Sequence, residues 1–267
     1  MKLSWHCKIA FLGFLVFPWS HLPAQGAQAP PARETSLDKL KLLQVLPLAA
    51  RLYHVQGMDL DGTRLWVTSV DRESRKGFLH LLDLPSGTLR KEVEVQDGEC
   101  FHPGGICLDG SSVWVPVAEY RRESRSLIQK RDRDTLSLVF SFPVEDHIGA
   151  VAAASDRLIG GNWDSRLLYF WSPSGKLLSR QPNPGATAYQ DMKINGRSLL
   201  ASGNRKEGGG TIDWLDIESL SLLRTIRAGK TDRGVPFTNE GVALYQGRLY
   251  LLPEDGPSRL FIFQLPQ

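Results

Sequence analysis

The stretch His54-Val55-Gln56-Gly57-Met58, followed by a turn and the apolar run Leu65-Trp66-Val67, decides the fold, because near-copies of it return four more times. The copies begin at residues 102, 147, 188 and 238, so the unit repeats at intervals of 41 to 50 residues. A repeat of roughly 40–50 residues built from short strands is typical of the blades of a β-propeller.

Each repeat divides into four expected strands separated by turns rich in Gly, Asp and Ser. In the first repeat these strands lie near residues 56–60, 65–69, 78–83 and 89–95. Later repeats have equivalent runs at 113–117, 127–131, 136–142, 167–171, 177–180, 211–216 and 222–226. No stretch after residue 29 has sustained helical periodicity. We therefore predict an all-β, five-bladed β-propeller over residues 42–267.

The last repeat has only three strands before the chain ends, so the ring needs a strand from elsewhere. The apolar segment 42–48 precedes the first full repeat and can supply the outer strand of the last blade. This closure would also remove an exposed sheet edge. We therefore expect the last blade to be completed by an N-terminal strand.

The first 29 residues have the pattern of a secretory signal peptide. Lys2 and Lys8 precede the apolar core 9–17, and the small residues that follow suit a signal peptidase. The apolar core is short for a bilayer span, so we favour cleavage over a retained anchor. We expect a linker at 30–41 and a mature protein that is secreted or periplasmic, monomeric, and without a membrane span.

The charge balance gives no reason to expect nucleic acid binding. The chain of 267 residues has 32 basic and 29 acidic side chains, which is a net charge of +3.

Two cysteines follow the expected signal peptide. Cys100 and Cys107 bracket His102, but no CxxC pair is present. A local disulfide or two buried thiols is therefore favoured over metal binding.

In a propeller the beginnings of the innermost strands converge at one mouth of the central channel, with the ends of the second strands around them. The first residues of the five repeats are therefore expected to be neighbours, although they are far apart in sequence. As catalytic candidates we take Glu240, His102 and His147. The ligand-binding candidates are His54, Gln56, Asn162, Trp163, Gln190, Asp191, Asn204 and Glu254.

Two other interpretations of this mouth stay open at the level of sequence. The polar residues can simply satisfy backbone groups around a water-filled channel, or they can hold one divalent cation.

Four tryptophans are expected to have a structural role. Trp66 and Trp114 occupy equivalent positions in the second strand of their repeats, as Trp171 and Trp214 do in the third, and we expect all four in the core between blades.

The repeat motifs resemble those of secreted five-bladed propellers, the plant and bacterial type of glutaminyl cyclase. Val55-Gln56-Gly57-Met58 matches the Gln-Gly-aliphatic part of the element in that family's first blade. Asn239-Glu240-Gly241-Val242-Ala243 is similar, with one insertion, to its Asn-Gly-Ile-Ala element, and Trp163 after Asn162 matches its Asn-x-Trp element. The resemblance implies a propeller fold and assigns site roles to Gln56, Asn162 and Trp163.

The same comparison shows where the chain departs from the family. The family's second blade carries a Phe-Gly-Glu-Gly element whose Glu belongs to the active site, but this chain has Phe101-His102-Pro103-Gly104-Gly105. Pro116-Val117 replaces a family tryptophan. The catalytic motif is therefore incomplete, and the three histidines suggest a divergent site.

The sequence favours a pocket for a small polar ligand or peptide, with a divergent cyclase-like acyl transfer as the chemistry it could support. Glu240 or a histidine would then be the base. Two alternatives belong to other classes. One is a non-catalytic propeller that binds proteins, and the other is a metal-dependent, lactonase-like hydrolase with ligands sought among Glu240, Asn162 and Asn204.

Overall fold

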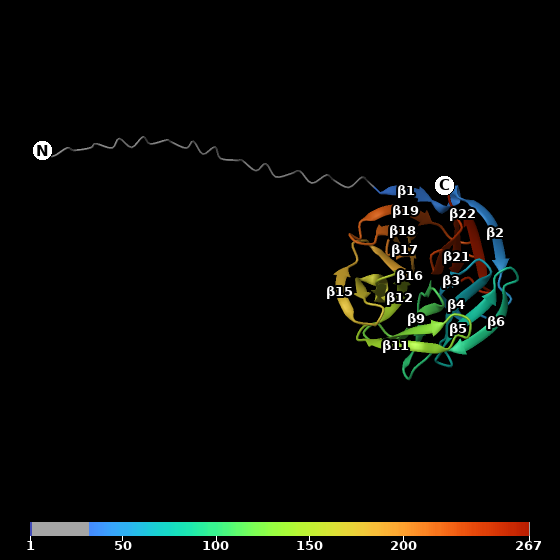
Figure 1. The fold of residues 1–267 in the computed structure, drawn as a ribbon. Helices are drawn as coiled ribbons and strands as arrows, with labels where there is room; N and C mark the ends of the chain where they lie inside the picture. The colour runs from blue at the N-terminus through green and yellow to red at the C-terminus, as the bar shows by residue number, and fades with distance from the viewer. Residues whose placement is uncertain (2–31, 267) are drawn as a thin grey trace. The chain divides into compact units, whose positions relative to one another are not determined.

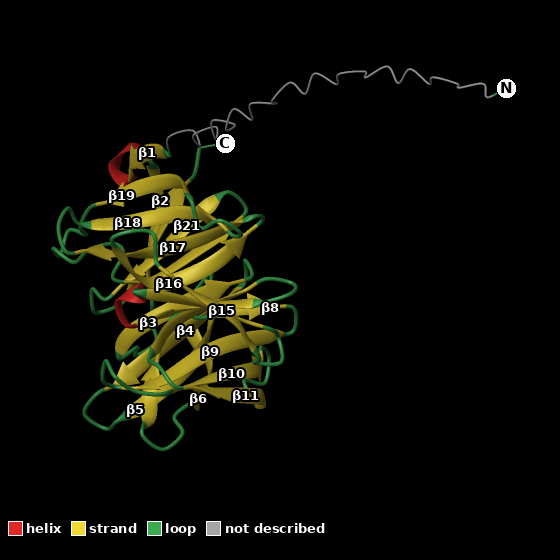
Figure 2. Ribbon diagram, turned by 90° about the vertical axis from the view of Figure 1, so that its left-hand side faces the viewer, coloured by secondary structure: helices red, strands yellow, loops and turns green. Residues whose placement is uncertain are grey.

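In the computed structural model, which describes Met1 and residues 32–266, five sheets of mainly antiparallel strands stand in a ring around a common axis (Figure 1). The predicted five-bladed β-propeller is therefore confirmed. The proposed signal peptide, residues 1–29, lies outside the described residues apart from Met1. Figure 2 shows the ring from the side, where strands dominate and two short 3-10 helices are the only helices drawn in the described part.

Each blade is a sheet whose strands follow the sequence order from the axis outward, except that β1 (Arg33–Ser36) and β2 (Lys41–Pro47) from the start of the described chain form the outermost strands of blades 4 and 5. Blade 1 contains β3 (His54–Leu60), β4 (Arg64–Asp71), β5 (Lys76–Asp83) and β6 (Thr88–Glu94). Blade 2 contains β7 (Cys100–Pro103), β8 (Cys107–Asp109), β9 (Ser112–Glu119), β10 (Ser126–Asp132) and β11 (Leu138–Val144). Blade 3 contains β12 (Ile148–Ala153), β13 (Leu158–Asn162), η2 (Trp163–Ser165), β14 (Leu167–Trp171) and β15 (Leu177–Pro182).

The last two blades recruit the start of the described chain. Blade 4 contains β16 (Thr187–Asn195), β17 (Ser198–Arg205), β18 (Gly210–Asp216) and β19 (Leu222–Ala228). Blade 5 contains β20 (Glu240–Tyr245), β21 (Arg248–Pro253) and β22 (Arg259–Gln264), and its outer strand is β2 (Lys41–Pro47). The expected closure by an N-terminal strand is confirmed, since β2 pairs antiparallel with β22.

The segment expected to be a linker is structured over much of its described part. β1 (Arg33–Ser36) pairs in parallel with the edge of β19, and η1 (Leu37–Lys39) follows it. The side chain of Leu37 is buried against Ile226 and other residues of blades 4 and 5. The buried leucine and the four residues of β1 that pair with β19 explain why this segment forms an extra strand of blade 4 and is not an unstructured linker.

The core consists of five apolar clusters, one in each space between adjacent blades. Trp66 packs between blades 1 and 2, Trp114 and Trp171 between blades 2 and 3, and Trp214 between blades 4 and 5. Their predicted place in the core is confirmed. Cys100 and Cys107 are free, buried thiols in this core. The packing fixes each blade against its neighbours and therefore fixes the relative positions of the inner strands.

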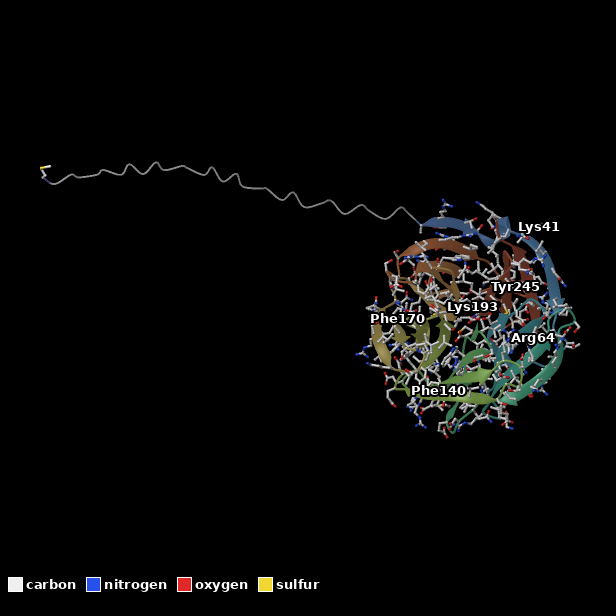
Figure 3. The ribbon with its side chains drawn as sticks, in the orientation of Figure 1. Lys41, Arg64, Phe140, Phe170, Lys193 and Tyr245 are labelled. Carbon is white, nitrogen blue, oxygen red and sulfur yellow. The ribbon has the colours of Figure 1, made fainter. Side chains whose placement is uncertain are left out.

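Small residues bring the inner strands into contact at the axis. A Cβ atom on Gly57 of β3 would collide with the Cα atom of Gly105, and one on Gly104 would collide with the carbonyl of Gly149. Blades 2 and 3 are also hydrogen-bonded here, from Gly105 N–H to Gly149 O at 2.8 Å. The side chain of Lys193, on β16, lies close to the axis, whereas Phe140 is on the periphery (Figure 3).

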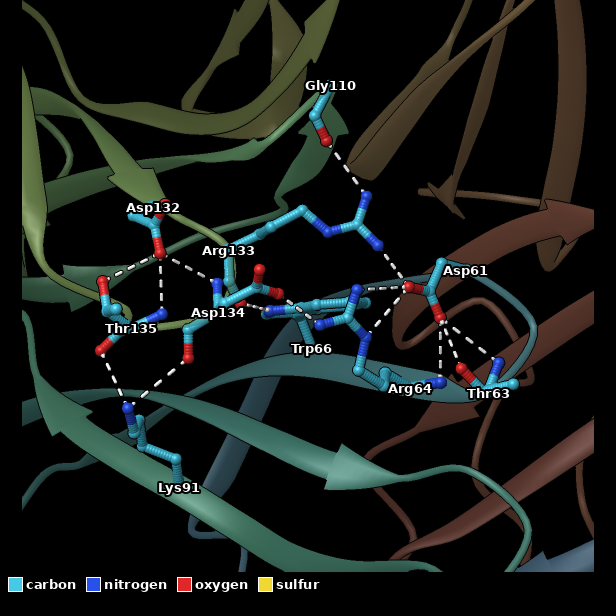
Figure 4. A network of polar contacts seen from close by, with 10 residues as sticks. All are labelled: Asp61, Thr63, Arg64, Trp66, Lys91, Gly110, Asp132, Arg133, Asp134 and Thr135. Atoms are coloured by element: carbon cyan, nitrogen blue, oxygen red, sulfur yellow. Dashed lines mark hydrogen bonds and ion pairs between the residues drawn. The ribbon is translucent and has the colours of Figure 1, made fainter.

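A charged network joins blades 1 and 2 on the face where the inner strands end (Figure 4). Arg64 and Arg133 both form ion pairs with Asp61, and both guanidinium groups lie within about 5 Å of the ring centre of Trp66. Burial favours the protonated carboxyl of Asp61, but hydrogen bonds from Arg64 outweigh it and lower the pKa of this group. The network stabilises the face opposite the mouth described next.

Candidate functional site

The beginnings of the inner strands converge on a cavity of about 200 Å³ at one mouth of the ring. Because β3, β7, β12, β16 and β20 all start at this face, residues from all five blades meet there. The residues that line it are His54, Gln56, His102, Tyr120, His147, Gly149, Asn162, Trp163, Asp164, Tyr189, Gln190 and Glu240. We call this cavity the mouth pocket.

β-bulges direct several of these residues into the mouth pocket. The pairing register shifts between Val55 and Gly57 in β3, between Ile148 and Ala150 in β12, and between Tyr189 and Asp191 in β16. The extra residues at these shifts are Gln56, Gly149 and Gln190, and all three line the pocket. Bulges of this kind commonly re-aim a side chain beside a functional site.

A hydrogen bond across two blades fixes the orientation of His102. Its Nε2 lies 2.7 Å from Oε1 of Gln56, while Nε2 of Gln56 donates to Val55 O at 2.9 Å. Because an amide oxygen only accepts, His102 carries its proton on Nε2. Burial and then the neighbouring His147 keep the pKa of His102 well below its usual value. His102 is therefore a neutral donor that positions Gln56.

His147 has the opposite tautomer. Its Nδ1 donates to the carbonyl of Arg121 at 2.9 Å, so its Nε2 carries a lone pair. Burial lowers the pKa of His147, which keeps the ring neutral near pH 7. The ring packs edge-on against Trp163, with 4.5 Å between ring centres. A neutral imidazole held by a backbone carbonyl can accept a proton or a hydrogen bond from a ligand.

Aromatic rings form one wall of the mouth pocket. Tyr120 contacts His102 edge-on at 4.2 Å between ring centres, and the ring of Trp163 lies 6.5 Å from that of His102. Arginine side chains lie over two of these rings: Arg72 is 5.3 Å from the ring centre of Tyr120, and Arg122 is 5.6 Å from that of Trp163. The wall offers flat apolar surface next to polar groups, which suits a small ligand.

Glu240 supplies the acidic group of the pocket. It is only 6% exposed, and no hydrogen bond or ion pair among residues 32–266 involves its carboxyl oxygens. Burial raises the pKa of Glu240 to about 8, with further contributions from the nearby Glu254 and Asp191. A buried carboxyl that titrates near neutral pH can give or take a proton under physiological conditions.

A nitrogen and two carboxylates lie close enough to hold a cation. Ligand atoms of His54, Glu240 and Glu254 are all within 4.8 Å of one another, and Nδ1 of His54 contacts a carboxyl oxygen of Glu254. Imidazole with carboxylates is a donor set that zinc and manganese accept. The predicted ligands Asn162 and Asn204 are not part of this cluster.

Eight of the eleven predicted site residues line the mouth pocket, and the other three do not. Glu254 lies beside it, next to His54. Asn204 is turned toward blade 5, where it donates to Asn239 at 2.9 Å and accepts from Thr238 at 2.8 Å. Asp191 is fully buried at the axis.

Asp191 holds the inner strands together. Its carboxylate accepts the backbone N–H groups of Met58 in blade 1 at 3.2 Å and Val242 in blade 5 at 3.0 Å, and it pairs with Lys193 at 2.6 Å. The interpretation that polar residues satisfy backbone groups therefore fits Asp191, and its assignment as a ligand-binding residue finds no support in this position.

The sequence also places Tyr120 near the mouth, where with Trp163 it was expected to form an apolar wall, but it gave no reason to select Asp164, Tyr189 or Arg72. Arg72 and Asp164 follow the second strand of a blade, the same position in the repeat as Asn162 and Trp163. Their position within the repeat thus indicated that they lie near the mouth. The residues selected from the sequence were those whose side chains are common catalytic groups or ligands.

The fold and the mouth pocket define a five-bladed propeller with a polar, aromatic-walled site. The chain belongs to the family described as "Family of unknown function (DUF6454)", whose model matches residues 36–187. No curated protein matches the chain.

Among solved structures, the Myxococcus xanthus glutaminyl cyclase is similar with a TM-score of 0.65 and 13% identity. The match covers 88% of this chain and 98% of that one. A protein of unknown function from Bacteroides caccae matches with a TM-score of 0.50 and 12% identity over 74% of this chain and 69% of its own. At these identities the likeness is one of fold. The resemblance to glutaminyl cyclase propellers is thereby confirmed as a distant structural relationship.

Within residues 32–266, no helix has the length and apolar character that a membrane crossing requires.

Proposed function

We propose that the mouth pocket binds the amino-terminal residue of a peptide and catalyses its cyclisation by acyl transfer, with Glu240 as the proton carrier. One observation carries the proposal: Glu240 is a buried carboxyl without a hydrogen-bond partner among the described residues, and it faces a pocket that also contains the unprotonated nitrogen of His147. The distant likeness to a glutaminyl cyclase supports an N-terminal glutamine as the first substrate to test.

The proposed step forms one bond and breaks one bond. The α-amino nitrogen of the peptide attacks the carbon of its own γ-carboxamide, and the bond from that carbon to the amide nitrogen breaks, which releases ammonia. Glu240 gives its proton to the departing nitrogen and regains one from the attacking amine. His102 and Gln56 orient the amide, and Trp163 packs against the side chain.

The position of Glu240 also compensates for the missing family carboxylate. The second blade of this chain has Phe101-His102-Pro103-Gly104 in place of the family's Phe-Gly-Glu-Gly, with no acidic residue there, and Glu240 reaches the mouth pocket from blade 5. A pKa of about 8 keeps this carboxyl protonated at neutral pH, as a proton donor to a leaving group must be.

The test is release of ammonia from a peptide with the sequence Gln-Ala-Ala-Ala-amide, followed by mass spectrometry. We expect Glu240→Gln to lower kcat/KM by roughly 10²- to 10⁴-fold, the usual contribution of general acid–base catalysis. An exposed glutamate, Glu123→Gln, is the matched control. Equal turnover by parent and Glu240→Gln would contradict the role of Glu240, and no turnover by the parent would overturn the cyclase proposal.

A second candidate is a metal-dependent hydrolase, which the cluster of His54, Glu240 and Glu254 favours. Elemental analysis of protein purified without chelator separates the two candidates. One equivalent of zinc or manganese that is lost in His54→Ala would support the hydrolase and argue against a free Glu240 carboxyl. If substitutions of the residues that line the mouth pocket leave the biological activity of the protein unchanged, a non-catalytic, protein-binding propeller explains the chain better than either enzyme.

The proposal includes export through the signal at residues 1–29 and a monomeric mature protein. N-terminal sequencing and size-exclusion chromatography of protein from the culture medium or periplasm test these two points. A mature chain that still begins at Met1 would contradict cleavage.

A further inference from the structure

A second, larger hollow adjoins the mouth pocket. It has a volume of about 870 Å³, and Asp164 lines both it and the mouth pocket. Its walls come from the η2 turn of blade 3, from the connection before and into β16, and from the end of β17 in blade 4. We call it the basic groove.

Basic side chains outnumber acidic ones in the basic groove. Its lining includes four basic residues, Arg122, Arg166, Arg205 and Lys206, and only two acidic ones, Asp164 and Glu207. Arg122 is neutralised by its ion pair with Asp164. Among residues 32–266, Arg166, Arg205 and Lys206 have no ion-pair partner, and all three are exposed. Three cationic groups are therefore available to a ligand.

The shape of the basic groove suits an extended chain. Gly185, Ala186 and Ala188 leave one side without bulky groups. Asn183 fixes this segment, because its amide donates to Thr187 O and its oxygen accepts from Gly185 N–H, both at 2.9 Å. Because this segment is already fixed and carries only small side chains, less conformational entropy is lost when a peptide binds against it.

The turn that carries Trp163 and Asp164 connects the two hollows, since Trp163 lines the mouth pocket and Asp164 lines both. Asp164 is in a left-handed conformation with φ of 58°. The ion pair from Arg122 to Asp164, together with the contact of Arg122 over Trp163, stabilises this turn. A peptide whose first residue occupies the mouth pocket can therefore continue past Asp164 into the basic groove.

We propose that the basic groove binds acidic residues that follow the amino-terminal residue of a peptide substrate, so that the protein selects peptides with Asp or Glu at positions two to four. This inference rests on the proposed function, because it needs the first residue in the mouth pocket. The volume of the basic groove exceeds that of the mouth pocket about fourfold, enough for several residues.

The experiment compares the acidic peptide Gln-Asp-Glu-Ala-amide with the neutral peptide Gln-Ala-Ala-Ala-amide. In the double variant Arg205→Glu/Lys206→Glu, the ratio of kcat/KM for the acidic peptide to that for the neutral peptide should fall roughly tenfold at low salt. The fall should shrink as ionic strength rises, since exposed charges are screened. Lys176→Glu/Arg197→Glu is the matched control, because both of its residues are exposed and lie on neither hollow.

A binding measurement separates this inference from the proposed function. Calorimetry with the pyroglutamyl form of the acidic peptide needs no turnover, and the double variant should bind it roughly tenfold more weakly than the parent. Selective loss of binding without turnover by the parent supports the groove and overturns the cyclase. Turnover with an unchanged acidic-to-neutral ratio, or an equal loss in the control variant, overturns the groove and leaves the cyclase standing.

Discussion

At the scale of single residues, the mouth pocket depends on how burial changes protonation. Burial disfavours charge, so it lowers the pKa of His102 and His147 and raises that of Glu240. All three side chains are therefore uncharged near pH 7. Their residue types alone would instead suggest an ion pair between a histidine and the glutamate. A neutral pocket of this kind can exchange protons with a bound ligand without first breaking an internal salt bridge.

The raised pKa of Glu240 predicts a pH-dependent stability. In the unfolded chain this carboxyl ionises near pH 4.5, but in the folded protein only near pH 8. The folded state thus holds one more proton between these values, and stability falls as pH rises. Relative to Glu240→Gln, the parent should lose about 1–2 kcal/mol of unfolding free energy between pH 6.5 and 8.

Urea unfolding at several pH values measures this difference. The buried histidines, whose pKa values are lowered in the folded state, do not interfere, because both proteins contain them and their contribution cancels in the difference. Glu123→Gln, which alters an exposed carboxyl, should follow the parent at every pH. Parallel curves for the parent and Glu240→Gln would mean that the carboxyl is ionised in the folded protein.

Residue type and repeat position together were sufficient to predict most of the pocket, but not the role of Asp191. Gln190 and Asp191 are adjacent polar residues at the same entry position, and the sequence gives no reason to separate them. The β-bulge in β16 does separate them: it leaves Gln190 unpaired beside the pocket and Asp191 at the axis. A register shift depends on how neighbouring strands pack, so it is not visible in one repeat alone.

At the scale of elements, the inner strands depend on glycine at the points where they touch. Pro103-Gly104-Gly105 interrupts the inner strand of blade 2, which is therefore split into β7 and β8 where a single strand was expected. Gly105 uses its backbone to bond blade 3 instead, from Val151 N–H at 3.0 Å. The repeat pattern predicted the strand but not this interruption, since it arises from contact between blades.

The contact between β3 and blade 2 predicts that Gly57→Ala is destabilising. A Cβ atom there would meet the Cα atom of Gly105, and backbone can move only if the two blades shift apart. Overpacking of this kind typically costs about 1–3 kcal/mol. Gly229→Ala is the control, because a Cβ atom at Gly229 has open space around it. Chemical denaturation should rank Gly57→Ala well below the parent and Gly229→Ala close to it; equal stability of the two variants would show that the inner strands are not in tight contact.

At the scale of the whole ring, two N-terminal strands make different contributions. β1 adds a fifth strand to blade 4, which already has four, whereas β2 is the fourth strand of blade 5 and closes the ring. The sequence predicted the second contribution because the last repeat lacks a strand. It did not predict the first, because no blade was short of a strand at that edge.

Two truncations separate these contributions. Removing the chain through Leu40 deletes β1 and the buried Leu37, and it should lower stability by about 2–3 kcal/mol, mainly the loss of one buried leucine. Removing it through Pro47 also deletes β2, which leaves β22 as an unpaired edge of hydrophobic residues. Such an edge is a template for association with other chains. The shorter truncation should therefore keep the oligomeric state of the parent and unfold cooperatively on heating, whereas the longer one should aggregate in size-exclusion chromatography with light scattering. If the longer truncation instead keeps the oligomeric state and the Tm of the parent, closure by β2 is not what holds the ring together.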